Sequence, residues 1–319
     1  MSGLGPIGTI NTQGVNTNFV EVGRTLFNGP DAFGPWRTWA GELPMDGLEL
    51  MTYMIGATGA VSEIAGARIW QQFRSYGRTV PAKKYGPPGI EIEAIKLQND
   101  TSGAIQGRLT GYLASAKDGF GKPAQEFYVS NPTCIDGQPL INGSHPFDSG
   151  GSTWTNDSTT ALSAAEMAVV IQAMRGRLDE FGVNLGINPT HLMVAGNLEQ
   201  IGTDITGADR VVGITTAGNP ALAALIGSGA AAMPNWAVQR GRLDLIVNQY
   251  MTAGTWAFMD LSKPDVRPIY YGIAKPFAAY VVDDPQSEPM KERSAFQYYA
   301  EGYAAFVGGV PQCIYGKDT

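Results

Sequence analysis

Apolar residues recur along the chain at two spacings, which predict different elements. The strongest helical signal begins at Ser163, which together with Glu166 forms a capping box. Behind this box the apolar side chains keep a period of 3.6 residues until Gly182, a residue type that commonly ends helices. This pattern predicts one long helix whose buried face consists of Met167, Val170, Ile171, Met174, Leu178 and Phe181.

A second helix is predicted after Asp100, with an apolar face formed by Ile105, Leu109, Tyr112, Leu113 and Ala116. Glycines at positions 103, 107 and 111 form another stripe on this helix. Each glycine costs about 1 kcal/mol of helix propensity. Close approach of another backbone is therefore the best explanation of the stripe. The stretch 118–123 is expected to bend or interrupt the helix.

Period-two alternation predicts strands elsewhere. It occurs at the start of Ile90–Leu97 (IEIEAIKL), and the apolar run His191–Ala195 predicts a buried strand. Short helices are expected from Asn197 and from Asn219, and strand-like segments dominate after Trp236. Helices and strands are thus mixed, with most strands late in the chain. This order predicts the α+β class and not a doubly wound βαβ sheet.

Two regions show no regular period. Residues 1–35 are rich in glycine, asparagine and threonine, and they are expected to form an irregular arm. Residues 68–89 contain five cations, no acidic residue and three prolines, interleaved with four aromatic rings. Because proline cannot continue a helix, this stretch predicts an extended, hairpin-like excursion.

Three interpretations of residues 68–89 compete. Cations and rings suit nucleic acid, a solvated loop would be the neutral alternative, and a docking arm would place arginine and aromatic residues against a neighbouring subunit. The chain has a net charge of −7 and a pI near 4.9, which disfavours nucleic acid as the main partner. Four rings in a proline-broken stretch disfavour the solvated loop. We therefore expect an intersubunit contact formed by Arg68, Trp70, Arg74, Tyr76, Arg78, Lys83, Lys84 and Tyr85, with Asp283, Asp284 and Glu288 as acidic acceptors.

Composition adds to this picture. Charged residues make up 16% of the 319 residues, whereas about 25% is usual, and there are 41 glycines. Low charge and abundant glycine indicate a surface that is largely covered by something else. The first 18 residues do not resemble a signal peptide, and no 18-residue apolar stretch could span a bilayer, so we expect a cytoplasmic, reducing setting.

Candidate chemistry is sparse. His145 and His191 are the only histidines, and neither lies in a known catalytic or metal-binding signature. The string Gly3–Gly8 matches G-x-G-x-x-G but has no preceding strand, and the turn at 227–229 does not satisfy G-x-S-x-G. Two cysteines, Cys134 and Cys313, provide neither a disulfide framework nor a zinc site. We expect no catalytic site, no cofactor and no metal.

Several segments resemble, in order, those of Mu-like major head subunits of tailed phages. The matching segments span roughly residues 65–310. They comprise residues 70–100 with Trp70, Arg74, Tyr85 and Asp100; Cys134–Gln138 followed by Ser144–Pro146, similar to a D-G-Q…H-P element; Asn188–Val194 with Leu198–Glu199; and Arg267–Gly309. In the apolar strand, Ala195–Asn197 replaces the family's proline-containing turn.

The resemblance implies the Hong Kong 97-type capsid fold. It implies an N-terminal arm and lead-in at 1–64, an extended loop at 65–97, a peripheral domain at 98–149 and 263–319 with a spine helix near 101–128, and an axial domain at 150–262. The implied function is a structural subunit of pentamers and hexamers in an icosahedral head around double-stranded DNA.

The resemblance further implies scaffold, portal and possibly decoration proteins as partners, weak non-specific DNA contact, and a virion assembled in the host cytoplasm. Two alternatives stay open. One is a nanocompartment shell of the same fold, and the other is a cytosolic mixed α/β enzyme that uses His145 or His191 with an acidic partner.

Overall fold

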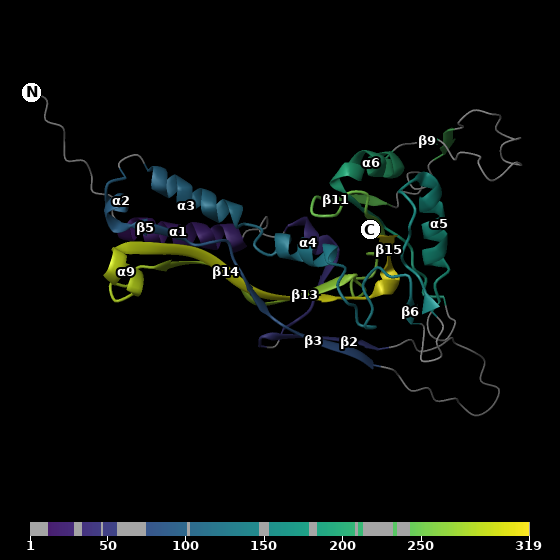
Figure 1. Ribbon diagram of the computed structural model, residues 1–319, viewed down its shortest axis with the longest axis horizontal. Helices are drawn as coiled ribbons and strands as arrows, with labels where there is room; N and C mark the ends of the chain where they lie inside the picture. The colour runs from purple at the N-terminus through teal and green to yellow at the C-terminus, as the bar shows by residue number, and fades with distance from the viewer. Residues whose placement is uncertain are drawn as a thin grey trace, which may run out of the picture.

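The computed structural model describes residues 12–28, 34–45, 47–55, 75–100, 103–146, 153–178, 184–207, 210–212, 232–234 and 243–318. Within these ranges the protein is a mixed helix-and-sheet structure built around one long β-ladder and a second, smaller sheet (Figure 1). The predicted Gly3–Gly8 string, the turn at 227–229 and the helix expected from Asn219 lie outside the described residues.

The ladder consists of two antiparallel strands of 14 residues each, β13 (Ile269–Val282) and β14 (Ala295–Gly308). The sequence predicts strand-like segments after Trp236, and proline favours a break between two of them at Pro276, but the structure continues β13 across this residue. The pairing register shifts between Ile273 and Ala278, because proline cannot donate a ladder hydrogen bond there. Short strands extend the sheet: β1 (Ala40–Glu42) runs parallel to β13, while β4 (Lys83–Tyr85) and β5 (Ile90–Glu93) pair with β14.

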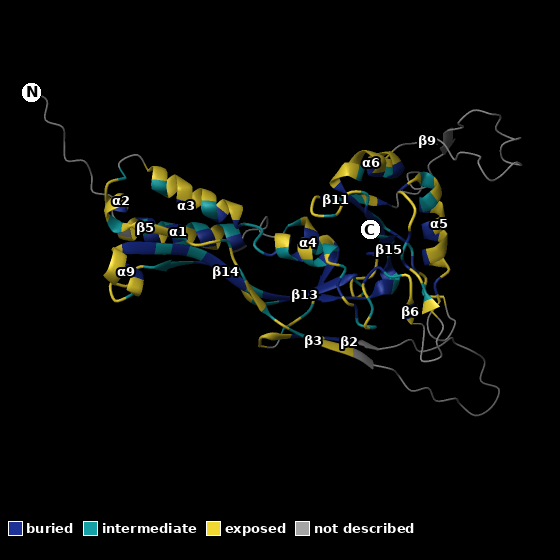
Figure 2. Cartoon of the chain, viewed as in Figure 1, coloured by how far each residue is buried: buried dark blue, intermediate teal, exposed yellow. Residues whose placement is uncertain are grey.

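Helices cover one face of the ladder. They are α1 (Thr12–Asn28), the short 3-10 helix η2 (Pro35–Thr38), α2 (Ala94–Gln98), α3 (Ala104–Ser115) and α4 (Gly121–Val129). The main hydrophobic core lies between these helices and the ladder, as the buried band in Figure 2 shows. The helix α9 (Glu288–Arg293) closes the far end between β13 and β14.

Helix α1 corrects the expectation of an irregular arm over residues 1–35. Val15, Phe19 and Phe27 are buried against the ladder, and they recur at a helical spacing. The surrounding asparagines, threonines and glycines have low helix propensity, so the local sequence does not predict a helix. Tertiary packing against the ladder overrides this propensity. Residues 1–11 of the expected arm lie outside the described residues.

The predicted excursion is partly a hairpin, displaced toward the N-terminus. Strand β2 (Glu49–Ile55), in the segment assigned to the lead-in, pairs antiparallel with β3 (Ser75–Pro81), and residues 56–74 between them lie outside the described residues. Leu50 is fully buried while Met51 is 51% exposed, which is the alternation of a strand. The base of the hairpin packs on the ladder face opposite the helices, where Leu50 joins Tyr270, Ala305 and Val307.

Two further predictions are corrected in this region. The strand expected over Ile90–Leu97 ends at Glu93, and helix α2 follows. The glycine stripe on α3 has no close neighbour within the described chain, because a Cβ added at Gly107 or Gly111 would meet nothing within 4 Å. The interruption predicted at 118–123 is confirmed, since α3 ends at Ser115 and α4 begins at Gly121.

The second sheet has the strand order β11-β8-β12-β15. Strand β8 (His191–Ala195) is central and buried, as predicted; it lies parallel to β11 (Asp244–Asn248) and antiparallel to β12 (Trp256–Met259). The C-terminal strand β15 (Ile314–Lys317) pairs with β12, so the last residues belong to this sheet and not to the long ladder.

Helices α5 (Ala164–Arg175) and α6 (Glu199–Gly207) pack on the second sheet, and α6 follows the 3-10 helix η3 (Gly196–Leu198). The predicted cap of α5 is confirmed, because the Glu166 backbone N–H donates to the Ser163 hydroxyl at 3.1 Å. The helix ends at Arg175 and not at Gly182. Leu178 is 42% exposed and forms a β-bridge with Asn184, so its apolar side chain is not part of the helix face.

Four short strands and one 3-10 helix complete the described elements. Strand β6 (His145–Pro146) pairs with β7 (Thr153–Trp154), and β9 (Arg210–Val212) pairs with β10 (Ala232–Pro234). The 3-10 helix η4 (Pro311–Cys313) links the ladder to β15.

Candidate interaction surfaces

Two cations of the excursion, Arg78 and Lys84, contact their own chain. The Arg78 guanidinium donates to the Thr133 carbonyl at 2.5 Å, and Lys84 forms an ion pair with Glu301. The hydrogen bond to Glu301 raises the pKa of Lys84 above its ordinary value. Lys83, between them, is exposed. Arg68, Trp70 and Arg74 lie outside the described residues, as does the side chain of Tyr76.

Tyr85 is a packing residue at the ladder. Its ring meets Phe120 edge-on at a centroid distance of 6.2 Å and Phe306 at 5.9 Å. Its partial burial raises the pKa of its hydroxyl. This ring therefore fixes strand β4 to the core, and its contacts here are within one chain.

The predicted acidic acceptors lie near the far end of the ladder. Asp283 accepts a hydrogen bond from the Asn16 side chain at 3.2 Å, and Asn16 in turn accepts one from the Tyr298 hydroxyl at 2.6 Å. Asp284 accepts from the backbone N–H of Gln286 at 2.8 Å, and Glu288 is exposed in the first turn of α9. Asp283 thus anchors α1, a role that sequence reasoning did not find.

The lysines of β4 lie far from Asp283 along the ladder. Lys84 is paired opposite Tyr303, whereas Val282, next to Asp283, is paired opposite Gln297. Six residues along β14 separate these positions, which is about 20 Å at the rise of a strand. A direct contact between Lys84 and Asp283 therefore requires two chains.

An aromatic cluster that the sequence analysis missed lies on the ladder face opposite the helices, in the half of the ladder near α9. Tyr280 and Tyr299 stack at a centroid distance of 5.3 Å. The Lys275 ammonium lies 4.7 Å from the Tyr280 ring centroid and 3.9 Å from the Glu301 carboxylate. All three tyrosines of this face, including Tyr303, are partly exposed. Tyr299 and Tyr303 are separated by an even number of residues on β14, which places them on one face once the strand boundaries are known.

The first histidine is a structural residue. His145 is completely buried, and its ring stacks on Trp154 at a centroid distance of 4.6 Å. Its Nδ1 lies 2.7 Å from an Asp136 carboxylate oxygen, and its Nε2 lies 3.1 Å from the Asn156 side-chain oxygen. Both ring nitrogens are thus occupied by the protein, which leaves neither for a substrate.

This histidine joins two segments that the sequence analysis singled out. Asp136 and Gly137 form a turn, with Gly137 in the left-handed region at φ 83°. The Asn156 amide group donates to the carbonyls of Leu140 and Pro311, so its oxygen faces His145. The D-G-Q…H-P element is therefore one buried polar network, and sequence order alone could not show which oxygens it pairs.

Arg177 fixes the C-terminal segment beside this network. Its guanidinium donates to the carbonyls of Pro311 and Ile314 and lies 4.3 Å from the Trp154 ring centroid. Burial lowers the pKa of Arg177 to about 10. The two cysteines are also buried and free, and burial raises the pKa of the Cys313 thiol to about 12, so it is an inert thiol at neutral pH.

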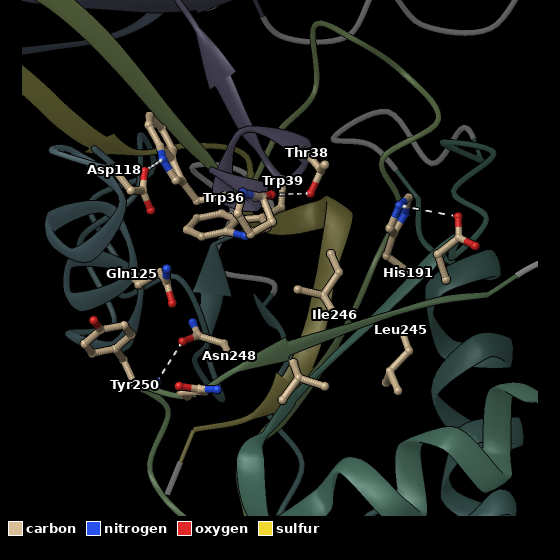
Figure 3. A pocket seen from close by; sticks show the side chains of 14 residues that line it. Trp36, Thr38, Trp39, Asp118, Gln125, His191, Leu245, Ile246, Asn248 and Tyr250 are labelled. Atoms are coloured by element: carbon tan, nitrogen blue, oxygen red, sulfur yellow. Dashed lines mark hydrogen bonds and ion pairs between the residues drawn. The ribbon is translucent and has the colours of Figure 1, made fainter. Parts of the chain in front are cut away.

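The second histidine lines an open cleft of about 590 Å³ (Figure 3). One wall is β11 and the residues after it, and the other consists of η2 with parts of α4 and the turn before it. His191 Nε2 lies 3.7 Å from Asp244, whose side chain is 86% exposed. Burial lowers the pKa of His191, while Asp244 acts in the opposite direction.

In the ranges that the structure describes, no group of three or more histidine, cysteine or acidic residues could hold a metal ion. Among the same residues, no helix is both long and apolar enough to cross a bilayer.

Comparison with known proteins gives a structural likeness but no match by sequence. No protein-family model matches the chain, and neither does any curated protein. The similar structures come from phage capsids. The chain resembles the procapsid of bacteriophage JBD30 with a TM-score of 0.49 and 11% identity, covering 96% of this chain and 74% of that one.

Two further structures are similar to a comparable degree. The capsid of a native GTA particle has a TM-score of 0.49 and 13% identity, with 88% of each chain covered. A structure from Gordonia phage Cozz has a TM-score of 0.47 and 12% identity, covering 89% of this chain and 86% of that one.

Proposed function

We propose that this chain is the major capsid protein of a tailed phage, a structural subunit that closes a shell from many copies of itself. The hairpin β2–β3 is the observation that supports this most directly. Its arms pair over seven residues each, and its base packs in the core. Two-stranded hairpins are marginally stable alone in water. Met51, at 51% exposed, and Leu48, at 64%, lie on it or at its start, so a neighbouring copy is the natural cover.

We assign the elements to the parts expected of the Hong Kong 97-type fold. In this proposal the hairpin with residues 56–74 is the extended loop, and α3 with α4 is the spine helix. The ladder forms the peripheral domain, and the second sheet with α5 and α6 forms the axial domain. A long ladder between two modules suits a subunit that contacts several neighbours, because symmetry multiplies individually modest contacts into a stable particle.

The proposed assembly consists of pentamers and hexamers that enclose double-stranded DNA in a virion built in the host cytoplasm. Scaffold and portal proteins, and possibly decoration proteins, are the proposed partners. The chain's acidic balance restricts DNA contact to weak, non-specific lining. No catalytic role is proposed, since the His145 nitrogens are both bound by protein oxygens. A nanocompartment shell is the second candidate, which the contents of the particles would distinguish.

Reversing the charge of one excursion lysine tests docking between copies. Lys83 is exposed, so Lys83→Glu is expected to leave the melting temperature unchanged and to abolish large particles in sedimentation velocity, because it repels the acidic end of a neighbouring ladder. Lys84→Glu is the matched control for folding. It places a carboxylate beside the buried Glu301, and the repulsion between the two carboxylates is expected to lower the melting temperature. Normal particles from Lys83→Glu would contradict docking through this residue.

A further inference from the structure

The ring of His145 lies between two oxygens that accept hydrogen bonds. Its Nδ1 lies 2.7 Å from an Asp136 carboxylate oxygen, and its Nε2 lies 3.1 Å from the Asn156 side-chain oxygen. A neutral imidazole has one N–H group and one bare nitrogen, whereas an imidazolium has two N–H groups. Both oxygens therefore receive a hydrogen bond only when both ring nitrogens carry a proton.

The orientation of the Asn156 amide is fixed by backbone groups and does not depend on how the histidine is protonated. Its oxygen accepts from the Asn142 backbone N–H at 2.7 Å, and its nitrogen donates to the carbonyls of Leu140 at 2.7 Å and Pro311 at 3.2 Å. Turning the amide over would set its NH₂ group against the Asn142 N–H and its oxygen against two carbonyls. Nε2 of His145 thus faces an oxygen that can only accept.

The carboxylate of Asp136 faces the other nitrogen. One of its oxygens accepts from the Gln138 backbone N–H at 3.1 Å, and the second faces Nδ1 of His145. This contact also needs a proton between the two groups. Because imidazole is a stronger base than a carboxylate, the proton belongs to Nδ1. The geometry therefore matches an imidazolium and a carboxylate that form a buried ion pair.

The surroundings of the ring compensate its charge. The His145 ring is completely buried, and the Asp136 side chain, which is 18% exposed, supplies the opposite charge. The ring also stacks on Trp154, and aromatic faces attract cations. Arg177 acts in the other direction, since its guanidinium lies 4.3 Å from the centroid of the same Trp154 ring. Asp148, the other charged residue between α4 and β7, lies outside the described residues.

The polar network joins two connections between the ladder and the second sheet. Residues 130–163 lead from α4 to α5, and η4 links β14 to β15. The Asn156 amide group bridges the two connections through the Pro311 carbonyl. The Asn156 carbonyl also accepts from the Gly316 N–H of β15 at 2.9 Å. The ring of His145 therefore supports the joint between the two sheets.

We propose that His145 is doubly protonated in the folded protein, and that this bound proton stabilises the joint between the ladder and the second sheet. Without the proton, either Nδ1 turns a lone pair toward the Asp136 carboxylate or Nε2 turns one toward the Asn156 oxygen. Each arrangement leaves a buried acceptor without a donor, which destabilises the fold. The inference concerns the single folded chain, so it goes beyond the proposed function and does not depend on assembly.

Solid-state NMR of protein labelled with ¹⁵N-histidine counts the ring protons directly, in monomers or in particles. His145 and His191 are the only histidines, so a His191→Gln variant assigns the two rings. Burial lowers the pKa of His191, so its ring carries a single N–H at neutral pH and is the internal reference. Two N–H groups are expected for His145 in the same sample. A single N–H on His145 would overturn the proposal.

The substitution Asp136→Asn removes the need for the proton. The new side-chain oxygen keeps the hydrogen bond from Gln138, while the amide N–H donates to Nδ1 of a neutral ring. As the pH rises through about 6.5, the ordinary pKa of histidine, the unfolded chain releases a proton that the folded unmodified protein retains. Stability that depends on this proton is therefore present at lower pH and is lost as the pH rises.

Urea denaturation at several pH values compares the two proteins. Between about pH 6.5 and pH 8, the ratio of folded to unfolded chains of the unmodified protein is expected to fall by up to about tenfold per pH unit relative to Asp136→Asn. His191 contributes equally to both proteins, so its titration cancels in the comparison. Parallel pH profiles of the two proteins would contradict the stabilising role of the proton.

Discussion

Replacing His145 by alanine is expected to lower the free energy of unfolding by about 3 kcal/mol. The ring is completely buried, stacks on Trp154 and holds Asp136 and Asn156 through its two nitrogens. Its removal leaves a cavity and takes a partner from two polar groups. Chemical denaturation followed by tryptophan fluorescence measures the change.

His191→Ala is the matched control, since it removes the other histidine of the chain. The His191 side chain is 21% exposed at the cleft, so its loss is expected to cost about 1 kcal/mol. Equal effects of the two substitutions would show that the buried network contributes no more than a surface residue. The account of the D-G-Q…H-P element would then be wrong.

Two glycine-to-alanine substitutions in helices are expected to change stability in opposite directions. A Cβ at Gly23 in α1 would lie 2.4 Å from the Ala279 Cβ, so Gly23→Ala must push the helix off the ladder and is expected to cost about 2 kcal/mol. A Cβ at Gly107 in α3 meets nothing within 4 Å, so Gly107→Ala is expected to stabilise the isolated chain by up to about 1 kcal/mol.

Thermal unfolding of the two variants measures whether each substitution raises or lowers the stability of the protein. Destabilisation by Gly107→Ala would show that the α3 stripe is closely packed within the chain after all. Stabilisation by Gly23→Ala would contradict the docking of α1 on β13. Because both changes add the same methyl group to a helical glycine, their difference reports packing and not propensity.

The sequence predicts elements best where local signals and burial agree. The N-cap at Ser163 and the apolar run of β8 are examples, and both are confirmed. The Glu166 side chain of the predicted capping box accepts instead from the Ser158 hydroxyl. Helix α1 was missed because its buried face of valine and phenylalanine is embedded in polar, glycine-rich residues, and the ladder that selects it lies more than 200 residues away in sequence. The continuity of β13 was missed because Pro276 looks like a boundary and is accommodated by a register shift.

The predicted contact residues show a different limit. Their type and charge were readable, but their partners depend on register. Lys84 is drawn to Glu301 because β4 happens to pair with residues 302–304 of β14. Asp283 is held by Asn16 of α1, a helix that was not predicted. Residue patterns identify charged groups that require an ion-pair or hydrogen-bond partner. The fold determines which of these partners lie in the same chain.

Electron microscopy of the purified protein, with and without co-expressed scaffold, tests the central claim most directly. The account predicts closed shells built from pentameric and hexameric capsomers, with nuclease-resistant DNA inside when the particles come from infected cells. Shells that contain a protein cargo and no DNA would favour the nanocompartment. A compact monomer under every assembly condition would contradict the proposal that this surface is built to meet copies of itself.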